Sequence, residues 1–283
     1  NGVKGFYEGE VATKIDTFMR ENGGLITKKD LKNYRPIWRE TLQGNFDEYK
    51  IVTMGPPSSG GVHIIQMLNI LENYDLVMMG HNSPTYTALL TESMKYAYAD
   101  RSKYLGDPDF FDVPVQSLIS KEYAEKIHNK IKLNTITPSD KVLPGSELRH
   151  ESLDTTHFSV ADKDGNIISN TYTLNSGFGS GVIIDGTGIL MNNEMDDFVS
   201  APGVPNQFGL IGGEANKIEP FKRPLSSMTP TIVLKDGKPV YATGSPGGSR
   251  IITTVLQFLL NTLVFKMEIS DATVVPRIHH QWK

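Results

Sequence analysis

The fold is decided by Thr155-Thr156-His157-Phe158-Ser159-Val160 and by Thr171-Tyr172-Thr173-Leu174-Asn175. Asp164-Gly165 lies between these two stretches and is one of the strongest signals for a tight β-hairpin. Residues 132–154, which come just before, are polar and irregular and show no apolar period. Such a segment predicts an exposed linker that can be cut without exposing a core. We therefore expect a hairpin whose first strand follows a cuttable linker.

Thr155 is the residue that such a cut would uncover. A threonine hydroxyl is a weak nucleophile and needs a base. Cleavage before Thr155 would free an α-amine whose reference pKa is about 7.7–8.0, so one residue would supply both nucleophile and base. From the residues alone, Thr155 and Thr156 are better explained as plain β-forming residues at the start of a strand. The nucleophile is therefore an alternative that needs further support.

Composition excludes several classes of protein. The 283 residues are 39% hydrophobic and 21% charged, which is an ordinary globular balance. The net charge of −4 comes without a basic stripe, so nucleic-acid binding is not indicated. The absence of cysteine excludes disulfides, cysteine-ligated zinc and a thiol nucleophile. The seven histidines show no metal-ligand spacing, and we expect neither a metal nor a cofactor.

The ends of the chain and its apolar runs bear on where the protein resides. No apolar run approaches the ~18 residues of a membrane span. The chain begins at Asn1 without an initiator methionine and stops abruptly at Lys283. We therefore expect it to be an internal piece whose targeting segment lies elsewhere.

Periodicity predicts an α+β protein with sheets between helical layers. A second hairpin is expected around Asp236-Gly237. Residues 199–224 are rich in proline and glycine and predict a long surface loop that could act as a lid. Helices are expected over residues 8–21, 62–71, 84–104, 118–131 and 251–265, and strands over Ile37–Leu42 and Tyr49–Thr53.

Several local patterns have both a functional and a plain explanation. The acidic run from Glu194 to Asp197 could hold a substrate ammonium, but a solvated turn is the simpler explanation. Gly247-Gly248 precedes a predicted helix and could present N–H groups to an oxyanion, or form a tight turn. Ser226-Ser227 could bind a carboxylate or belong to an ordinary loop. The run 55–61 could bind an anion or allow close packing.

Five motifs in order settle which explanations to prefer. They resemble γ-glutamyltranspeptidases, most closely bacterial members, and the likeness covers essentially all 283 residues. The motifs are Thr155-Thr156-His157-Phe158-Ser159-Val160, Thr171-Tyr172-Thr173-Leu174-Asn175, Asn192-Asn193-Glu194-Met195-Asp196-Asp197-Phe198, Arg223-Pro224-Leu225-Ser226-Ser227-Met228 and Gly244-Ser245-Pro246-Gly247-Gly248-Ser249-Arg250.

The resemblance implies an N-terminal-nucleophile (Ntn) hydrolase with a four-layer αββα sandwich. Family members are made as one chain that cuts itself before the threonine matching Thr155. This implies a large-subunit part at residues 1–154 and a small-subunit part at 155–283, which share one core and stay associated. Thr155 then attacks the γ-glutamyl carbonyl of glutathione or a related amide and passes the acyl group to water, an amino acid or a peptide. A periplasmic or extracellular location is also implied.

The resemblance assigns roles to individual residues. It aligns the family's carboxylate-binding arginine upstream of Asn1. It leaves open a relative that acts on poly-γ-glutamate or as an acylase, and a non-catalytic or unprocessed precursor. The matching positions are Thr173 for orienting the nucleophile, Asn175, Glu194 and Asp197 for the substrate α-ammonium, Ser226 and Ser227 for its α-carboxylate, and Gly247 and Gly248 for the oxyanion.

Overall fold

The computed structural model describes residues 2–142 and 155–282, which fall into two units. The first unit comprises Asn1–Arg39 and Leu174–Asn193, and the second comprises Glu40–Thr173 and Glu194–Lys283.

The first unit holds short helices and a small hairpin. Ala12 and Ile15 are its buried apolar residues on the second helix. Thr27 caps the third helix through reciprocal hydrogen bonds with Asp30. Lys14 donates to the Gly186 carbonyl at 3.1 Å, which ties the helices to the hairpin. The elements are α1 (Gly2–Tyr7), α2 (Glu10–Glu21), α3 (Lys28–Asn33), β5 (Ile183–Ile184) and β6 (Ile189–Leu190).

The second unit is built on an antiparallel sheet with strand order β1-β2-β7-β8. The predicted strand Ile37–Leu42 is wrong, because the strand begins where that prediction ends. Gly44 lies inside the strand, where a Cβ would come within 2.8 Å of the Ile65 side chain. The turn that follows the strand is made at Asp47, whose φ is 52°. The strands are β1 (Leu42–Phe46), β2 (Tyr49–Thr53), β7 (Thr231–Lys235) and β8 (Lys238–Thr243).

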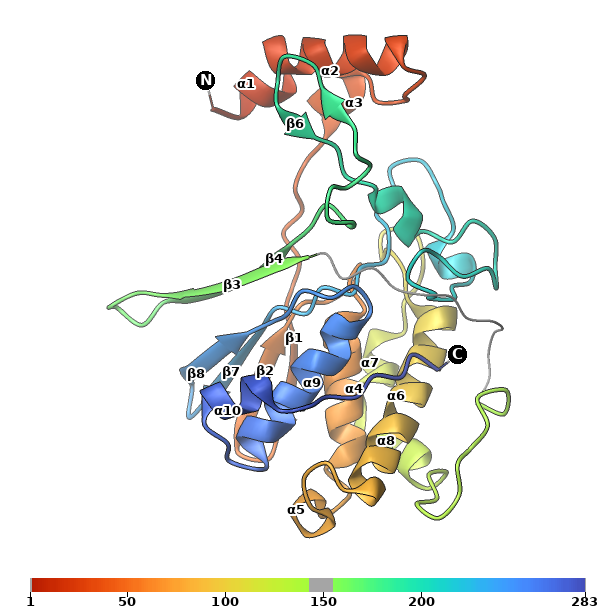
Figure 1. The fold of residues 1–283 in the computed structure, drawn as a ribbon, viewed down its shortest axis with the longest axis vertical. Coiled ribbons are helices and arrows are strands. Elements are labelled where there is room, and N and C mark those ends of the chain that lie inside the picture. Colours follow the sequence, from red (N-terminus) through yellow and green to blue (C-terminus); the bar gives the residue numbers. More distant parts are fainter. Residues whose placement is uncertain (1, 143–154, 283) are drawn as a thin grey trace. The chain divides into compact units, whose positions relative to one another are not determined.

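Helix α4 (Gly60–Leu71) is the centre of the core, and all its residues are buried. It packs against β1, β2 and four other helices, which Figure 1 shows gathered beside the sheet. At its start, a Cβ on Gly61 would lie 2.1 Å from the Met54 carbonyl oxygen, so the glycines of this loop permit close packing. The other helices are α5 (Leu76–Met79), α6 (Pro84–Tyr104), α7 (Val115–Leu118), α8 (Lys121–His128), α9 (Arg250–Leu263) and α10 (Ile269–Val274).

The predicted hairpin is present as β3 (Thr156–Ala161) and β4 (Ile167–Tyr172). Its turn passes through Gly165 at φ 84°, a conformation that favours glycine. The hairpin packs against β7 and β8, and the Ser169 hydroxyl donates to the Thr243 carbonyl at 2.9 Å.

The core is shared by segments on either side of the predicted cut. Strand β2 pairs along its whole length with β7, and α4 packs against α9. Residues 40–142 and 155–282 therefore cannot separate without breaking a sheet and exposing apolar side chains.

Residues 199–224 differ from the predicted surface loop. Phe208, Leu210 and Ile211 are buried in the main core, and the short 3-10 helix η2 (Glu214–Asn216) buries Ala215. The prediction of a surface loop is therefore wrong for this part of the segment, and the lid stays a prediction. The apolar residues among its prolines and glycines favour burial over exposure.

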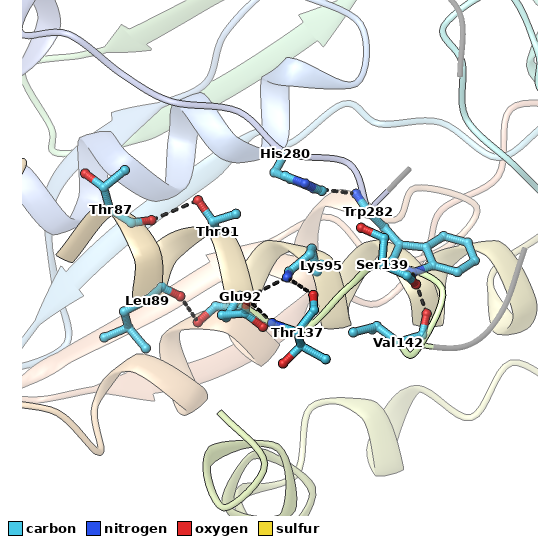
Figure 2. A network of polar contacts seen from close by, with 11 residues as sticks. Thr87, Leu89, Thr91, Glu92, Lys95, Thr137, Ser139, Val142, His280 and Trp282 are labelled. Carbon is cyan, nitrogen blue, oxygen red and sulfur yellow. Dashed lines mark hydrogen bonds and ion pairs between the residues drawn. The ribbon is translucent and has the colours of Figure 1, made fainter. Parts of the chain in front are cut away.

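A buried ion pair fastens the segment that leads toward the predicted cut. The Lys95 ammonium lies 2.5 Å from Glu92 Oε1 and donates to the Thr137 carbonyl at 2.5 Å. The Thr137 N–H donates in turn to Glu92 Oε1 at 3.3 Å. Figure 2 shows these side chains converging, with the Trp282 indole donating to the Ser139 carbonyl at 2.9 Å.

These contacts anchor the first half of the predicted linker 132–154 to the rest of the second unit. Its second half, residues 143–154, which includes Asp154 of the predicted cut, lies outside the described residues.

Candidate active site

Thr155 and Thr173 meet at the open end of the β3–β4 hairpin. Thr156 pairs with Tyr172, so the next residues out along both strands lie opposite each other. Thr155 Oγ1 donates to Thr173 Oγ1 at 3.4 Å, longer than the usual O–H···O distance of about 2.7–2.8 Å. Both side chains are half-buried. A nucleophile and a hydroxyl that orients it require such a contact, and the two roles stay predictions.

The His157 side chain, on β3, packs against the loop that follows β8. A Cβ on Gly244 would lie 2.2 Å from His157 Nδ1, so only glycine fits there. The imidazole shares hydrogen bonds with the Thr171 hydroxyl at 2.8 Å and the Ser159 hydroxyl at 3.2 Å. Burial lowers the pKa of His157. These contacts give His157 a structural role.

Gly247 and Gly248 follow this loop and lead into α9. Their φ angles are 128° and 53°, which strain any residue with a side chain. Neither N–H donates a hydrogen bond to another residue of the described parts of the chain. Adjacent backbone N–H groups at the start of a helix are suited to stabilising an oxyanion.

Ser226 is held by the loop that precedes α4. The Ser226 N–H donates to the Pro57 carbonyl at 2.8 Å, and the Ser59 N–H donates to the Ser226 carbonyl at 2.9 Å. The Ser59 hydroxyl donates to the same carbonyl at 2.9 Å. The loop therefore fixes the backbone of the serine pair, a role that the sequence analysis did not predict.

Arg101 reaches Ser227 from α6. Its Nε donates to the Ser59 hydroxyl at 3.0 Å and its Nη2 to the Ser227 hydroxyl at 3.3 Å. Only 3% of the residue is exposed. Arg101 was not among the predicted site residues, although it continues the apolar stripe that includes Met94 and Ala97. A cation on a buried helix face was the signal that could have identified it.

Glu194 and Asp197 occupy the short 3-10 helix η1 (Glu194–Asp197). Burial raises the pKa of Glu194. Burial, and then the neighbouring Glu194 carboxyl, raise the pKa of Asp197 well above its usual range, while the Arg101 charge acts in the opposite direction. Two crowded carboxyls gain from a bound cation, which favours the predicted ammonium site over a solvated turn.

Asn216 links this acidic helix to the serine loop. Its amide donates to the Asp197 carbonyl at 2.8 Å, and its Oδ1 accepts from the Leu225 N–H at 3.0 Å. The side chain is 2% exposed. Because Leu225 precedes the serine pair, Asn216 couples the two predicted substrate-binding segments.

Asn175 belongs to the first unit, so its predicted part in the site stays a prediction. Its φ is 76°, and its amide donates to the Asn193 carbonyl at 3.3 Å. The Asn193 side chain accepts from the Ser176 N–H at 2.9 Å. These bonds hold Asn175 in an uncommon backbone conformation.

Within 2–142 and 155–282, no group of three histidine or acidic side chains could hold a metal ion. In the same ranges, every helix is too short or too polar to cross a membrane.

The sequence profile described as gamma-glutamyltranspeptidase matches residues 1–283. The chain belongs to the γ-glutamyltranspeptidase family. The glutathione hydrolase proenzyme of Escherichia coli (strain K12) is 53% identical to this family member over 282 residues, covering 100% of the chain and 49% of the relative. The acylase ACY 1 proenzyme of Pseudomonas sp. (strain SE83) is 40% identical over 277 residues, covering 98% of the chain and 47% of the relative.

The solved structures agree on the fold of this γ-glutamyltranspeptidase family member. Cephalosporin acylase from Bacillus halodurans matches with a TM-score of 0.80 at 28% identity, covering 97% of the chain and 47% of that structure. The predicted N-terminal-nucleophile hydrolase fold is therefore confirmed. The chain spans about half the length of the curated relatives it matches.

Proposed function

We propose that the protein containing this chain is a self-processing threonine-nucleophile enzyme. It cleaves γ-glutamyl amides such as glutathione and transfers the γ-glutamyl group to water, amino acids or peptides. The observation that carries the proposal is the pair of threonine hydroxyls, Thr155 Oγ1 and Thr173 Oγ1, 3.4 Å apart at the start of a hairpin in this family.

Processing needs only groups of the chain itself and water. Thr155 Oγ attacks the Asp154 carbonyl, the C–N bond breaks as the proton moves to the amine, and an ester replaces the amide. Water then hydrolyses the ester, which leaves the Asp154 carboxylate and a free Thr155 α-amine. Residues 1–154 and 155–283 become parts of two subunits. The β2–β7 pairing across the cut supports their staying associated.

Catalysis follows with the same hydroxyl. The Thr155 α-amine takes the proton from Oγ as it attacks the γ-glutamyl carbonyl, and Thr173 orients the hydroxyl. The Gly247 and Gly248 N–H groups stabilise the negative charge on the tetrahedral oxygen. The leaving amine takes the proton, and water or an acceptor amine then attacks the ester and restores Thr155.

Substrate recognition uses opposite charges at two places. Glu194, Asp197 and Asn175 bind the α-ammonium, and Ser226 and Ser227 bind the α-carboxylate. The raised pKa values of the two acids support this, because a cation relieves their repulsion. We also propose a periplasmic or extracellular location, which rests on the resemblance and on the absence of cysteine.

A second candidate is amide acylase activity or cleavage of poly-γ-glutamate. Similarity to an acylase proenzyme and to a cephalosporin acylase structure favours keeping it. Rates with glutathione, poly-γ-glutamate and an acylated cephalosporin decide between them. Preference for glutathione supports the first proposal.

Thr155→Ala in the full-length protein tests the nucleophile. We expect loss of the cut in intact-mass spectrometry and loss of at least a thousandfold in release of p-nitroaniline from γ-glutamyl-p-nitroanilide. Thr273→Ala, on the exposed face of α10, is the matched control and should leave both unchanged. Persistent activity in Thr155→Ala would show that another residue is the nucleophile.

A further inference from the structure

We propose that Arg101 is a positioning residue for substrate recognition, which directs the Ser227 hydroxyl at the substrate α-carboxylate and supplies the positive charge facing Asp197. This inference rests on the proposed function. It adds a residue from α6, which lies before the cut, to binding groups that lie after it.

The hydrogen-bond chemistry sets the direction of the hydroxyls. A guanidinium carries only donors, so the Ser227 and Ser59 hydroxyls must both accept from Arg101. The Ser59 hydroxyl then uses its own hydrogen on the Ser226 carbonyl, at 2.9 Å. The Ser227 hydroxyl keeps its hydrogen for another acceptor. An anion such as a carboxylate is the acceptor that gains most from it.

The charge of Arg101 is buried without a carboxylate in contact. No acidic side chain within residues 2–142 and 155–282 forms an ion pair with it, and its third acceptor is the Leu225 carbonyl at 3.5 Å. Burial lowers the pKa of Arg101 to about 10, so it stays charged at neutral pH. A buried cation is costly unless something compensates it.

Two groups can supply the compensation. Asp197 lies close enough for the Arg101 charge to lower its pKa, against the effects of burial and Glu194. The α-carboxylate of a bound substrate at Ser227 supplies a second negative charge. Arg101 therefore favours the ionised form of Asp197, which an ammonium group needs. It also leaves the Ser227 hydroxyl as a donor, which a carboxylate needs. Both requirements match the head group of an α-amino acid.

Three anilides separate these contributions in the full-length, processed enzyme. γ-Glutamyl-p-nitroanilide carries both head-group charges, 4-aminobutanoyl-p-nitroanilide lacks the carboxylate and glutaryl-p-nitroanilide lacks the amine. The variants are Arg101→Met, which removes the charge, and Arg101→Lys, which keeps the charge but not the fork of donors. Lys103→Met is the control, because Lys103 is an exposed cation on the same helix.

For Arg101→Lys we expect KM for γ-glutamyl-p-nitroanilide to rise about 10- to 100-fold with a smaller change in kcat, the loss typical of one charge-assisted hydrogen bond. The substrate without the carboxylate should be affected little, so the preference for the γ-glutamyl group shrinks. Arg101→Met should add a loss on the substrate that lacks the carboxylate, because Asp197 loses its cation. In a Ser227→Ala background the effect of Arg101→Lys on KM should largely disappear.

Equal losses on all three substrates, in proportion to a lowered melting temperature, would overturn the positioning role. So would additivity of Arg101→Lys and Ser227→Ala. If neither Arg101 variant accumulates as folded protein, Ser59→Ala removes the other hydroxyl that holds the guanidinium and should raise KM selectively; an unchanged KM would overturn the proposal. A wild-type enzyme that cleaves none of the three substrates would instead contradict the proposed function.

Discussion

Helix α6 buries two cations six residues apart, and they are compensated in different ways. Lys95 is 2% exposed and lies 2.5 Å from Glu92 on the preceding turn. Arg101 is 3% exposed and donates to two serine hydroxyls without contacting a described carboxylate. The Lys95 charge is neutralised by a neighbouring residue of the same helix, as Figure 2 shows. The Arg101 charge is not neutralised in this way and is available to a ligand.

The difference suggests how a buried charge that stabilises the fold can be distinguished from one that serves ligand binding. Removing one partner of a closed pair leaves the other buried and uncompensated, so stability falls. Removing Arg101 breaks no ion pair among the described residues. It takes donors from two neutral hydroxyls and a nearby positive charge from Asp197, so the loss appears mainly in binding. Removing Lys95 should therefore lower stability more than it changes KM, and removing Arg101 should change KM more than it lowers stability.

Lys95→Met should give the largest effect on stability. It leaves the Glu92 carboxylate buried beside Thr137, so we expect a loss of about 3–5 kcal/mol in the free energy of unfolding. Urea denaturation of the full-length protein measures it. Adding Glu92→Met to Lys95→Met should restore most of the loss, since an apolar pair replaces an ion pair of similar volume. A double variant as unstable as Lys95→Met would contradict this account.

Asp100, adjacent to Arg101, adds a buried carboxyl to the comparison. Burial raises its pKa from 3.8 to about 6, although Gln66 and Tyr123 donate to it and act in the opposite direction. Between these values the folded protein binds more protons than the unfolded chain. Stability should therefore fall as pH rises from about 4 to 6, by about 2–3 kcal/mol at 1.36 kcal/mol per unit.

Asp100→Asn should abolish this contribution to the pH dependence. Urea denaturation of both proteins at pH 4 and pH 7 tests it, and the wild-type protein should lose more stability between them than the variant. Parallel changes in the two proteins would show that Asp100 does not titrate in this range.

Asp197→Asn should give the smallest change in stability and a large change in recognition. The raised pKa of Asp197 means that its ionised form is disfavoured in the ligand-free protein, so neutralising it should stabilise that state above the folded pKa. We expect a gain in stability that is larger at pH 8 than at pH 4, measured by thermal unfolding without substrate. KM for γ-glutamyl-p-nitroanilide should rise at the same time. A destabilised variant at pH 8 would contradict the assignment.

Local signals predicted the elements that carry the site. Pro84 begins both the predicted helix and α6, and Asp164-Gly165 predicted the hairpin in which Thr155 lies opposite Thr173. The family resemblance assigned functional roles to the residues of these motifs. Local sequence patterns alone were equally consistent with turns, loops and strand starts. Strand β1 was misplaced because Gly44-Asn45 looks like a turn, whereas packing against Ile65 requires glycine within the strand.

The role of Arg101 could not be predicted in the same way. Its partners Ser59 and Ser227 are 42 and 126 residues away, so only the packed structure brings them together. The same holds for Asn216, which joins Asp197 to Leu225 through one side chain. Sequence patterns report which residues are buried, and they do not report which distant groups share a buried charge.

The most direct test compares Lys95→Met and Arg101→Met side by side in the processed enzyme. Melting temperature and KM for γ-glutamyl-p-nitroanilide are measured in one buffer, with kinetics taken where both variants are folded. The account predicts that Lys95→Met melts at the lower temperature and keeps the wild-type KM, whereas Arg101→Met raises KM at least tenfold with the smaller loss of melting temperature. Equal KM values in the two variants would contradict it.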